Sequence, residues 1–137
     1  MTTGKLAYTF KFTGTLLFAY IVFGVLLMSF QDRLIFFPTR GGKVAGPGVD
    51  LTLHAEDGPA LHARYIEHPG AQYTLLYFHG NAGNLENRSE LLESFADFGA
   101  NVLALEYRGY GQSEGDPSEA GLYLDARAAY DWAVARV

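Results

Sequence analysis

Cysteine is absent from the 137 residues of this sequence. Its absence excludes a disulfide framework, a thiol nucleophile and any metal site built from thiolates. It does not indicate a cellular compartment, because folds without disulfides occur in oxidising and reducing surroundings alike. The length leaves room for one apolar anchor and one small soluble unit, so a two-domain enzyme is also excluded.

Basic residues are scarce: the chain has 10 of them against 15 acidic residues, which gives a net charge of −5. Lys5 and Lys11 are the only charged residues before position 32, so the rest of the chain is more acidic still. A basic stripe is the usual mark of a nucleic-acid-binding protein, and none is present. We therefore expect no nucleic-acid partner.

The sequence also lacks the patterns that hold a metal or a nucleotide. The histidines are His54, His62, His68 and His79. No two of them have the i, i+2 or i, i+4 spacing of a metal site. The glycines of residues 109–115 follow a predicted strand, but their spacing does not fit a dinucleotide-binding fingerprint. We therefore expect no cofactor and no metal, with a nucleotide-binding α/β domain as a minor alternative.

One uncharged apolar run of 20 residues, at positions 12–31, stands near the start of the chain. As a helix it is about 30 Å long, the thickness of the hydrocarbon core of a bilayer. It exceeds the apolar region of a signal peptide, and no small-x-small cleavage site follows Met28 and Ser29. Residues 1–31 are therefore predicted to form an uncleaved single-pass anchor in a lipid bilayer. A signal peptide and a buried soluble helix are the alternatives, and nearly equal basic residues on both sides leave the membrane side open.

The next segment, residues 32–48, is predicted to be a glycine-rich tether. Its glycines and Pro47 form a spacer that neither a helix nor a strand tolerates. The stretch Leu-Ile-Phe-Phe-Pro at 34–38 is expected at the membrane interface. The soluble domain is predicted to begin near Val49.

Hydrophobic periodicity predicts an α/β fold for the soluble part. Apolar residues alternate on both sides of the turn residues Asp57 and Gly58, which indicates a β-hairpin. Continuous apolar runs at 73–78 and 102–105 are typical of parallel strands buried on both faces, and the segment between them can form a crossover helix. A second helix is predicted to open with Asp116 as its cap and to reach the region of Val137.

A small, glycine-punctuated loop, His-Gly-Asn-Ala-Gly-Asn at 79–84, follows the strand predicted at 73–78. Backbone amides fixed at the carboxyl end of a parallel strand can donate hydrogen bonds to a developing oxyanion. The alternative is a strand-to-helix turn whose glycines provide backbone freedom alone.

Residues 111–115 read Gly-Gln-Ser-Glu-Gly and match the G-x-S-x-G pattern of a nucleophile elbow. That motif requires a strand that runs directly into the serine and a helix that leaves directly from it. Here polar residues separate the predicted strand from Ser113, and the helix begins later. We therefore predict that Ser113 lies in a surface loop and is not a nucleophile, and that Arg108 fixes this loop by pairing with a carboxylate or a carbonyl.

Two long motifs, at 79–84 and at 106–126, follow an N-terminal anchor and the stretch LIFFPTR. In this order they resemble the membrane-anchored α/β-hydrolases called Bem-type or serine aminopeptidase-like. The resemblance implies that residues 49–137 form the N-terminal part of an α/β-hydrolase sheet. It also implies that the backbone amide of Asn81 serves an oxyanion hole, with Ala82 as a possible second donor. Glu106 departs from this family, which usually has aspartate there.

The same resemblance implies a membrane-anchored serine hydrolase that cleaves esters, thioesters or amides through an acyl-enzyme. In that family the nucleophile, the acid and the catalytic histidine come later than Val137, so the triad is expected to be missing and this chain alone inactive. The strand at 73–78 would then have an open edge. The alternative is a noncatalytic anchored module, either truncated or completed by a partner chain.

Overall fold

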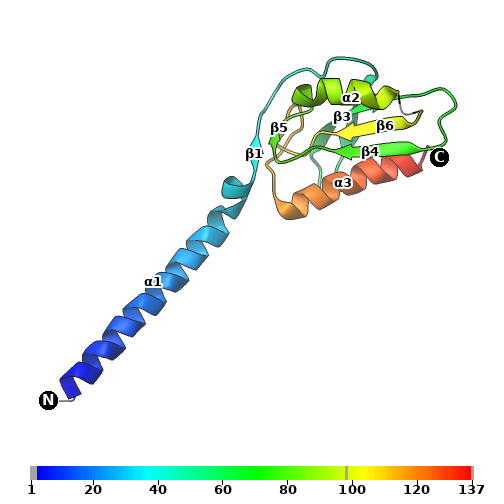
Figure 1. The fold of residues 1–137 in the computed structure, drawn as a ribbon. Coiled ribbons are helices and arrows are strands. Elements are labelled where there is room, and N and C mark those ends of the chain that lie inside the picture. Colours follow the sequence, from blue (N-terminus) through cyan, green and yellow to red (C-terminus); the bar gives the residue numbers. More distant parts are fainter. Residues whose placement is uncertain (1–2, 98, 137) are drawn as a thin grey trace. The chain divides into compact units, whose positions relative to one another are not determined.

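A computed structural model of the chain describes residues 3–97 and 99–136, and it divides into two compact units, Met1–Leu34 and Ile35–Val137. The first unit is formed by the long helix α1 (Thr3–Ile35) (Figure 1). The part Lys11–Ile35 has a mean hydropathy of 2.0 and is not buried. Its length and composition suffice to cross a membrane, although a signal sequence meets the same criteria.

The second unit is built on a four-stranded sheet within the described residues. The strands, in spatial order, are β2 (Val49–His54), β3 (Ala60–Ile66), β6 (Asn101–Leu105) and β4 (Thr74–Phe78). β2 and β3 form the predicted antiparallel hairpin, and β4 and β6 are the predicted parallel pair, with Leu76 opposite Leu103. The turn of the hairpin contains Gly58 at φ 115°, a conformation that favours glycine.

Two helices cover opposite faces of this sheet (Figure 1). Val102 and Ala104 of β6 pack in one core with Leu92 of α2 (Ser89–Ala96), which follows the short 3₁₀ helix η1 (Glu86–Arg88). The alternate residues Leu103 and Leu105 pack in the other core with α3 (Glu119–Val134). Because successive side chains of a strand point to opposite faces, a strand covered on both faces is apolar throughout.

The start of α3 differs from the prediction. Its N-cap is Ser118, whose side chain accepts a hydrogen bond from the amide of Gly121 at 3.2 Å. Asp116 is not the cap, because its carboxylate pairs with Arg40 at 2.8 Å. The described helix ends at Val134, and the predicted end at Val137 lies outside the described residues.

The segment 35–48 contributes a short strand to the second unit. In this segment β1 (Phe37–Pro38) pairs in parallel with β5 (Ala82–Gly83). Nearby, the amide of Gly111 donates to the carbonyl of Thr39 at 2.8 Å. Part of the stretch predicted to be a tether is thus hydrogen-bonded to the loops that follow β4 and β6. The amino-acid composition does not predict these contacts, because they are made by backbone groups that every residue type carries.

Candidate functional site

The loop after β4 lies beside the end of β6, because parallel strands place their carboxyl ends at the same edge of a sheet. His79 opens this loop with its side chain buried, whereas Gly80, Asn81 and Ala82 are exposed. Glu106 follows β6 directly and is 2% exposed. The two chain segments therefore meet in a buried histidine–carboxylate contact beneath an exposed loop.

Asn81 is fixed through its side chain and its carbonyl. The side-chain amide donates to the carbonyl of Ile35, and the side-chain oxygen accepts from the amide of Phe37 at 3.3 Å. The buried hydroxyl of Tyr110 donates to the carbonyl of Asn81 at 2.7 Å. The backbone N–H of Asn81 makes no hydrogen bond to any residue that the structure describes. Its neighbour Ala82 lies opposite Phe37 in the β1–β5 pair.

Beneath this loop, the carboxylate of Glu106 connects three chain segments. Both of its oxygens accept from the amide of Leu85, at 3.0 and 3.2 Å. Oε1 lies 3.3 Å from Nε2 of His79, and Oε2 lies 3.9 Å from Nδ1 of His62. On its other side His62 meets Asp50, at 3.1 Å. A row of ionisable groups thus leads from the partly exposed Asp50 to the loop.

The electrostatics of this row favour the charged forms of two groups. Burial by itself would raise the pKa of Glu106, but the facing His62 and His79 and the amide of Leu85 lower it below its ordinary value. The Glu106 carboxylate raises the pKa of His62 against the opposing effect of burial, and Asp50 raises it further.

Sequence reasoning did not anticipate this row of groups. His62, His79 and Glu106 belong to separate strands or their ends, so no spacing in the sequence marks them as neighbours. The one available signal was the chemistry of Glu106, a charged residue directly after a run of apolar ones.

Ser113 lies in irregular structure, as predicted, but the predicted surface position is wrong, since the residue is only 4% exposed. Its hydroxyl donates to the carbonyl of Glu106 at 2.7 Å and accepts from the amide of His62 at 2.9 Å. The loop folds back over the end of β6, and Ser113 thereby joins β3 to β6. Both hydrogen bonds are to backbone groups, so Ser113 is not paired with a general base.

The prediction for Arg108 is confirmed. Its guanidinium donates to Asp57 at 2.7 and 2.9 Å and to the fully buried Asp125 of α3 at 2.8 and 2.9 Å. Hydrogen bonding to Asp57, and then to Asp125, raises the pKa of Arg108 above its ordinary value. These contacts tie the loop after β6 to α3 and to the turn of the hairpin.

Two cavities adjoin the loop. One, of about 180 Å³, is lined by Phe36, His79, Gly80, Asn81, Tyr107, Tyr110 and Leu122. The second, of about 370 Å³, is lined by Phe36, Tyr107, Glu119, Leu122, Tyr123 and Ala126. They share Phe36, Tyr107 and Leu122, so they are neighbours, and the larger one has a single charged residue in its lining.

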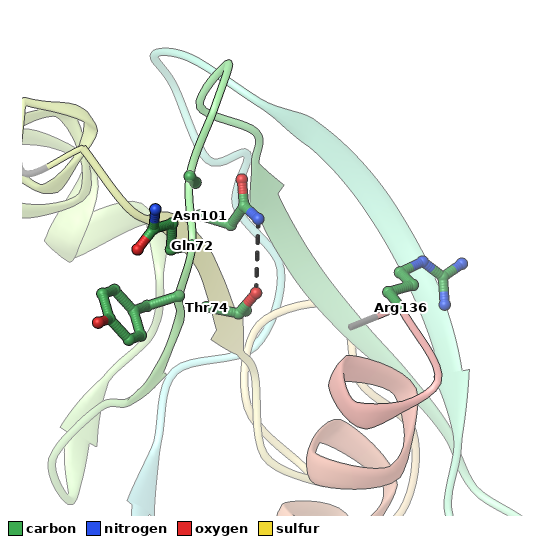
Figure 2. Close-up of a pocket in the computed structure, with 6 residues that line it drawn as sticks. Gln72, Thr74, Asn101 and Arg136 are labelled. Carbon is green, nitrogen blue, oxygen red and sulfur yellow. Dashed lines mark hydrogen bonds between the residues drawn. The ribbon is translucent and has the colours of Figure 1, made fainter.

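Another cavity, of about 210 Å³, lies at the amino end of β4 (Figure 2). Its lining is polar and includes Gln72, Thr74, Asn101 and Arg136, and the side chain of Asn101 donates to Thr74 at 3.5 Å. Ligands of open α/β sheets bind outside the carboxyl ends of the strands, which is the opposite end of β4. The cavities beside residues 79–81 are therefore the candidate site.

Comparison with family models gives no match. Among curated proteins, the chain is 38% identical over 125 residues to the α/β-hydrolase domain-containing protein WAV2 of Arabidopsis thaliana, and the match covers 81% of this chain and 41% of WAV2. It is 46% identical over 67 residues to protein bem46 of Schizosaccharomyces pombe, with coverage of 48% and 22%. The chain thus spans less than half the length of the curated relatives it matches.

Among solved structures, the esterase Pf2001 of Pyrococcus furiosus is similar to this chain with a TM-score of 0.61 and 25% identity. The similarity covers 72% of this chain and 40% of the esterase. The fold seen here is therefore part of an α/β-hydrolase domain.

Proposed function

This chain has an α/β-hydrolase fold, and from that fold and its similarity to α/β-hydrolase proteins we propose that it forms part of a membrane-anchored serine hydrolase. The reaction is the cleavage of an ester, thioester or amide through an acyl-enzyme. The observation that carries the proposal is the exposed loop at the carboxyl end of β4. There the side chain and carbonyl of Asn81 are held, while its N–H has no partner among the described residues.

In the proposed reaction, the N–H of Asn81 donates to the oxyanion of the tetrahedral intermediate. A donor held in place before the reaction stabilises developing negative charge without reorganisation. The amide of Ala82 is the possible second donor from this loop. The carbonyl of the substrate would lie in the cavity of about 180 Å³ that Gly80 and Asn81 line.

We propose that the nucleophile, the acid and the catalytic histidine are supplied by sequence outside this chain. The buried, backbone-bonded position of Ser113 supports this assignment, because a nucleophile needs access to substrate and a positioned base. The greater length of the relatives supports it as well.

The neighbouring cavity of about 370 Å³ suits the apolar part of an acyl substrate. Tyr107, Leu122 and Ala126 provide an apolar lining, and the cavity lies in the size range of small-molecule sites. Helix α1 is the proposed membrane anchor, supported by the uncharged run at 12–31.

The test compares two substitutions of Asn81 in the longest continuous protein that the gene encodes. Asn81→Pro removes the N–H, whereas Asn81→Ala keeps the N–H and removes the side-chain contacts. Loss of an oxyanion donor lowers kcat by roughly 10²–10³-fold. We expect the kcat of Asn81→Pro to be lower than the kcat of Asn81→Ala by this factor. Both are measured with p-nitrophenyl acyl esters.

Equal losses in the two variants would contradict the role of the Asn81 amide. A continuous protein that binds no fluorophosphonate probe and hydrolyses no ester would support the noncatalytic alternative. The 137-residue chain alone is expected to show neither labelling nor turnover.

A further inference from the structure

The side-chain carboxamide of Asn81 binds the residues on either side of Phe36. Its Nδ2 donates to the carbonyl of Ile35, and its Oδ1 accepts from the amide of Phe37 at 3.3 Å. The β1–β5 pair places Phe37 opposite Ala82. The same register, continued by one residue toward the start of the chain, places Phe36 opposite Asn81. The carboxamide contacts therefore lie where the parallel ladder would continue.

The side chain of Asn81 makes the hydrogen bonds that its backbone would make in a longer ladder. In a parallel pair, the N–H of a residue donates to the residue before its partner, and its C=O accepts from the residue after that partner. Opposite Phe36, these groups are the Ile35 carbonyl and the Phe37 amide, which the carboxamide binds instead. An asparagine side chain offers both a donor and an acceptor, as a peptide unit does. The backbone N–H of Asn81 thus makes no ladder bond.

This arrangement fixes the backbone on both sides of Phe36, next to the candidate site. The side chain of Phe36 is half-buried and is one of the three that line both cavities beside Asn81, together with Tyr107 and Leu122. The next side chain, Phe37, is 59% exposed and lines neither of these cavities. Such alternation is expected of an extended backbone, whose successive side chains point to opposite sides.

We propose that Phe36 is a specificity-determining residue for the acyl group of the substrate. The cavity of about 180 Å³ contains Asn81 in its lining, and the cavity of about 370 Å³ shares Phe36 with it. An acyl group whose carbonyl lies at Asn81 passes Phe36 when it extends into the larger cavity. The choice of an acyl ligand rests on the proposed function, but the position of Phe36 between the cavities does not. The residue directly after α1 thereby belongs to the site.

Phe36 is also the shared residue that can be changed with the least effect on the fold. The ring of Tyr107 packs against Phe78 and His79, with centroids 5.9 and 5.3 Å away. Leu122 belongs to α3, and its amide donates to the carbonyl of Ser118 in the first turn. Phe36 precedes β1 and lies in neither a helix nor the four-stranded sheet. Substitutions at position 36 therefore test the passage between the cavities.

The experiment uses two ketones that cannot be hydrolysed, acetone and the longer 2-heptanone, with the 137-residue chain in lipid nanodiscs. Binding is followed by nuclear magnetic resonance through the amide signals of Gly80 and Asn81. We expect 2-heptanone to bind more tightly than acetone, by up to about fourfold for each methylene that it buries. Partition of each ketone into the lipid is the same for all variants, so it cancels when variants are compared.

Phe36→Trp enlarges the side chain and narrows the passage. We expect it to reduce the preference for 2-heptanone over acetone by roughly tenfold or more, because the longer chain no longer enters the larger cavity. The matched control is Phe37→Trp, the same change at the neighbouring residue, which lines neither cavity and should keep the preference. Equal preferences in the two folded variants would overturn the proposal, and so would the failure of either ketone to bind the unsubstituted chain.

Phe36→Ala tests the same passage in the opposite direction and does not depend on a larger side chain being accommodated. It is expected to improve the binding of pinacolone, whose carbonyl carries a tert-butyl group, relative to acetone by about tenfold. An unchanged ratio of the two affinities would also overturn the proposal.

None of these measurements requires hydrolysis. If the continuous protein cleaves no ester, the proposed function fails, while the ketone preferences still decide the role of Phe36. If the protein cleaves esters and the proline and alanine variants of Asn81 differ as expected, equal ketone preferences in the two tryptophan variants would overturn the role of Phe36 alone.

Discussion

At the scale of single residues, polar side chains in the second unit hold the backbone together between strands. Ser113 is an example, because its hydroxyl connects the amide of His62 to the carbonyl of Glu106. A motif that reads as catalytic in the sequence is therefore a structural bridge in the fold. This position changes what a substitution at Ser113 should do.

We expect Ser113→Ala to lower the free energy of unfolding by roughly 1–3 kcal/mol, because the buried His62 amide loses its acceptor. Chemical denaturation of the whole chain in micelles, followed by the fluorescence of Trp132, measures the change. Probe labelling of Ser113 by a fluorophosphonate, abolished in Ser113→Ala, would contradict its structural role.

The contacts of His62 predict a stability that depends on pH. Because Glu106 and Asp50 raise its pKa in the folded state, His62 stabilises the fold fully below its unfolded-state pKa. That contribution is lost as the pH rises through the folded-state pKa. Relative to the unsubstituted chain, His62→Gln should therefore be most destabilised at about pH 5–6, below the ordinary histidine value of about 6.5, and less so at higher pH.

Denaturation curves of both proteins across this pH range provide the comparison. The exposed His54, changed to glutamine, is the matched control for replacing a histidine outside this row of groups. The opposite outcome is that the free energies of unfolding of His62→Gln and the unsubstituted chain differ by a constant amount, or by more as the pH rises. Either result would show that the contacts of His62 do not favour its charged form.

At the scale of elements, β4 is the strand whose observed exposure differs most from the burial that its sequence predicts. It reads as a strand buried on both faces, yet within the described residues it pairs only with β6. Tyr73, just before it, is 75% exposed, and Leu75 and Phe78 are 40% and 37% exposed. An apolar edge with unpaired backbone groups invites pairing with another chain.

We expect the chain to self-associate through the edge of β4. A lysine at an edge opposes such pairing, so Leu75→Lys should shift the chain toward the monomer in light scattering after size-exclusion chromatography. Leu91→Lys on α2 is the matched control, since Leu91 is 41% exposed. If both variants associate as strongly as the original chain, the edge of β4 is not the contact.

At the scale of the whole molecule, the described residues combine one helix that is apolar enough to cross a membrane with part of an α/β-hydrolase fold. The uncharged run at 12–31 predicts a helix that remains in the bilayer, because it carries no formal charge and is long enough to span the hydrocarbon core. Membrane association should then resist treatments that release peripheral proteins.

We expect the full-length chain to stay in the membrane fraction after alkaline carbonate extraction. Intact-mass analysis should find residues 1–31 still attached. Recovery of a shorter, soluble chain that begins after Ser29 would instead show that the helix is a cleaved signal sequence.

The sequence by itself determined the order of the main strands and helices, although not the short strands β1 and β5. Alternating and continuous apolar runs identified the hairpin and the two parallel strands, since the period of burial is a local property of each strand. The loop of residues 79–83 could be found in the same way, because glycines directly after a buried strand mark an exposed turn. Its proposed role in catalysis came from the resemblance.

Only the tertiary structure decided which polar groups meet. The start of α3 was misplaced because Asp116 pairs with Arg40, a residue 76 positions away. The burial of Ser113 and the contact of His79 with Glu106 depend on how separate strands end beside one another. Such contacts produce no periodic pattern in the sequence. A hydrogen bond between distant segments depends on the packing of the sheet, and not on the sequence neighbours of the two residues that it joins.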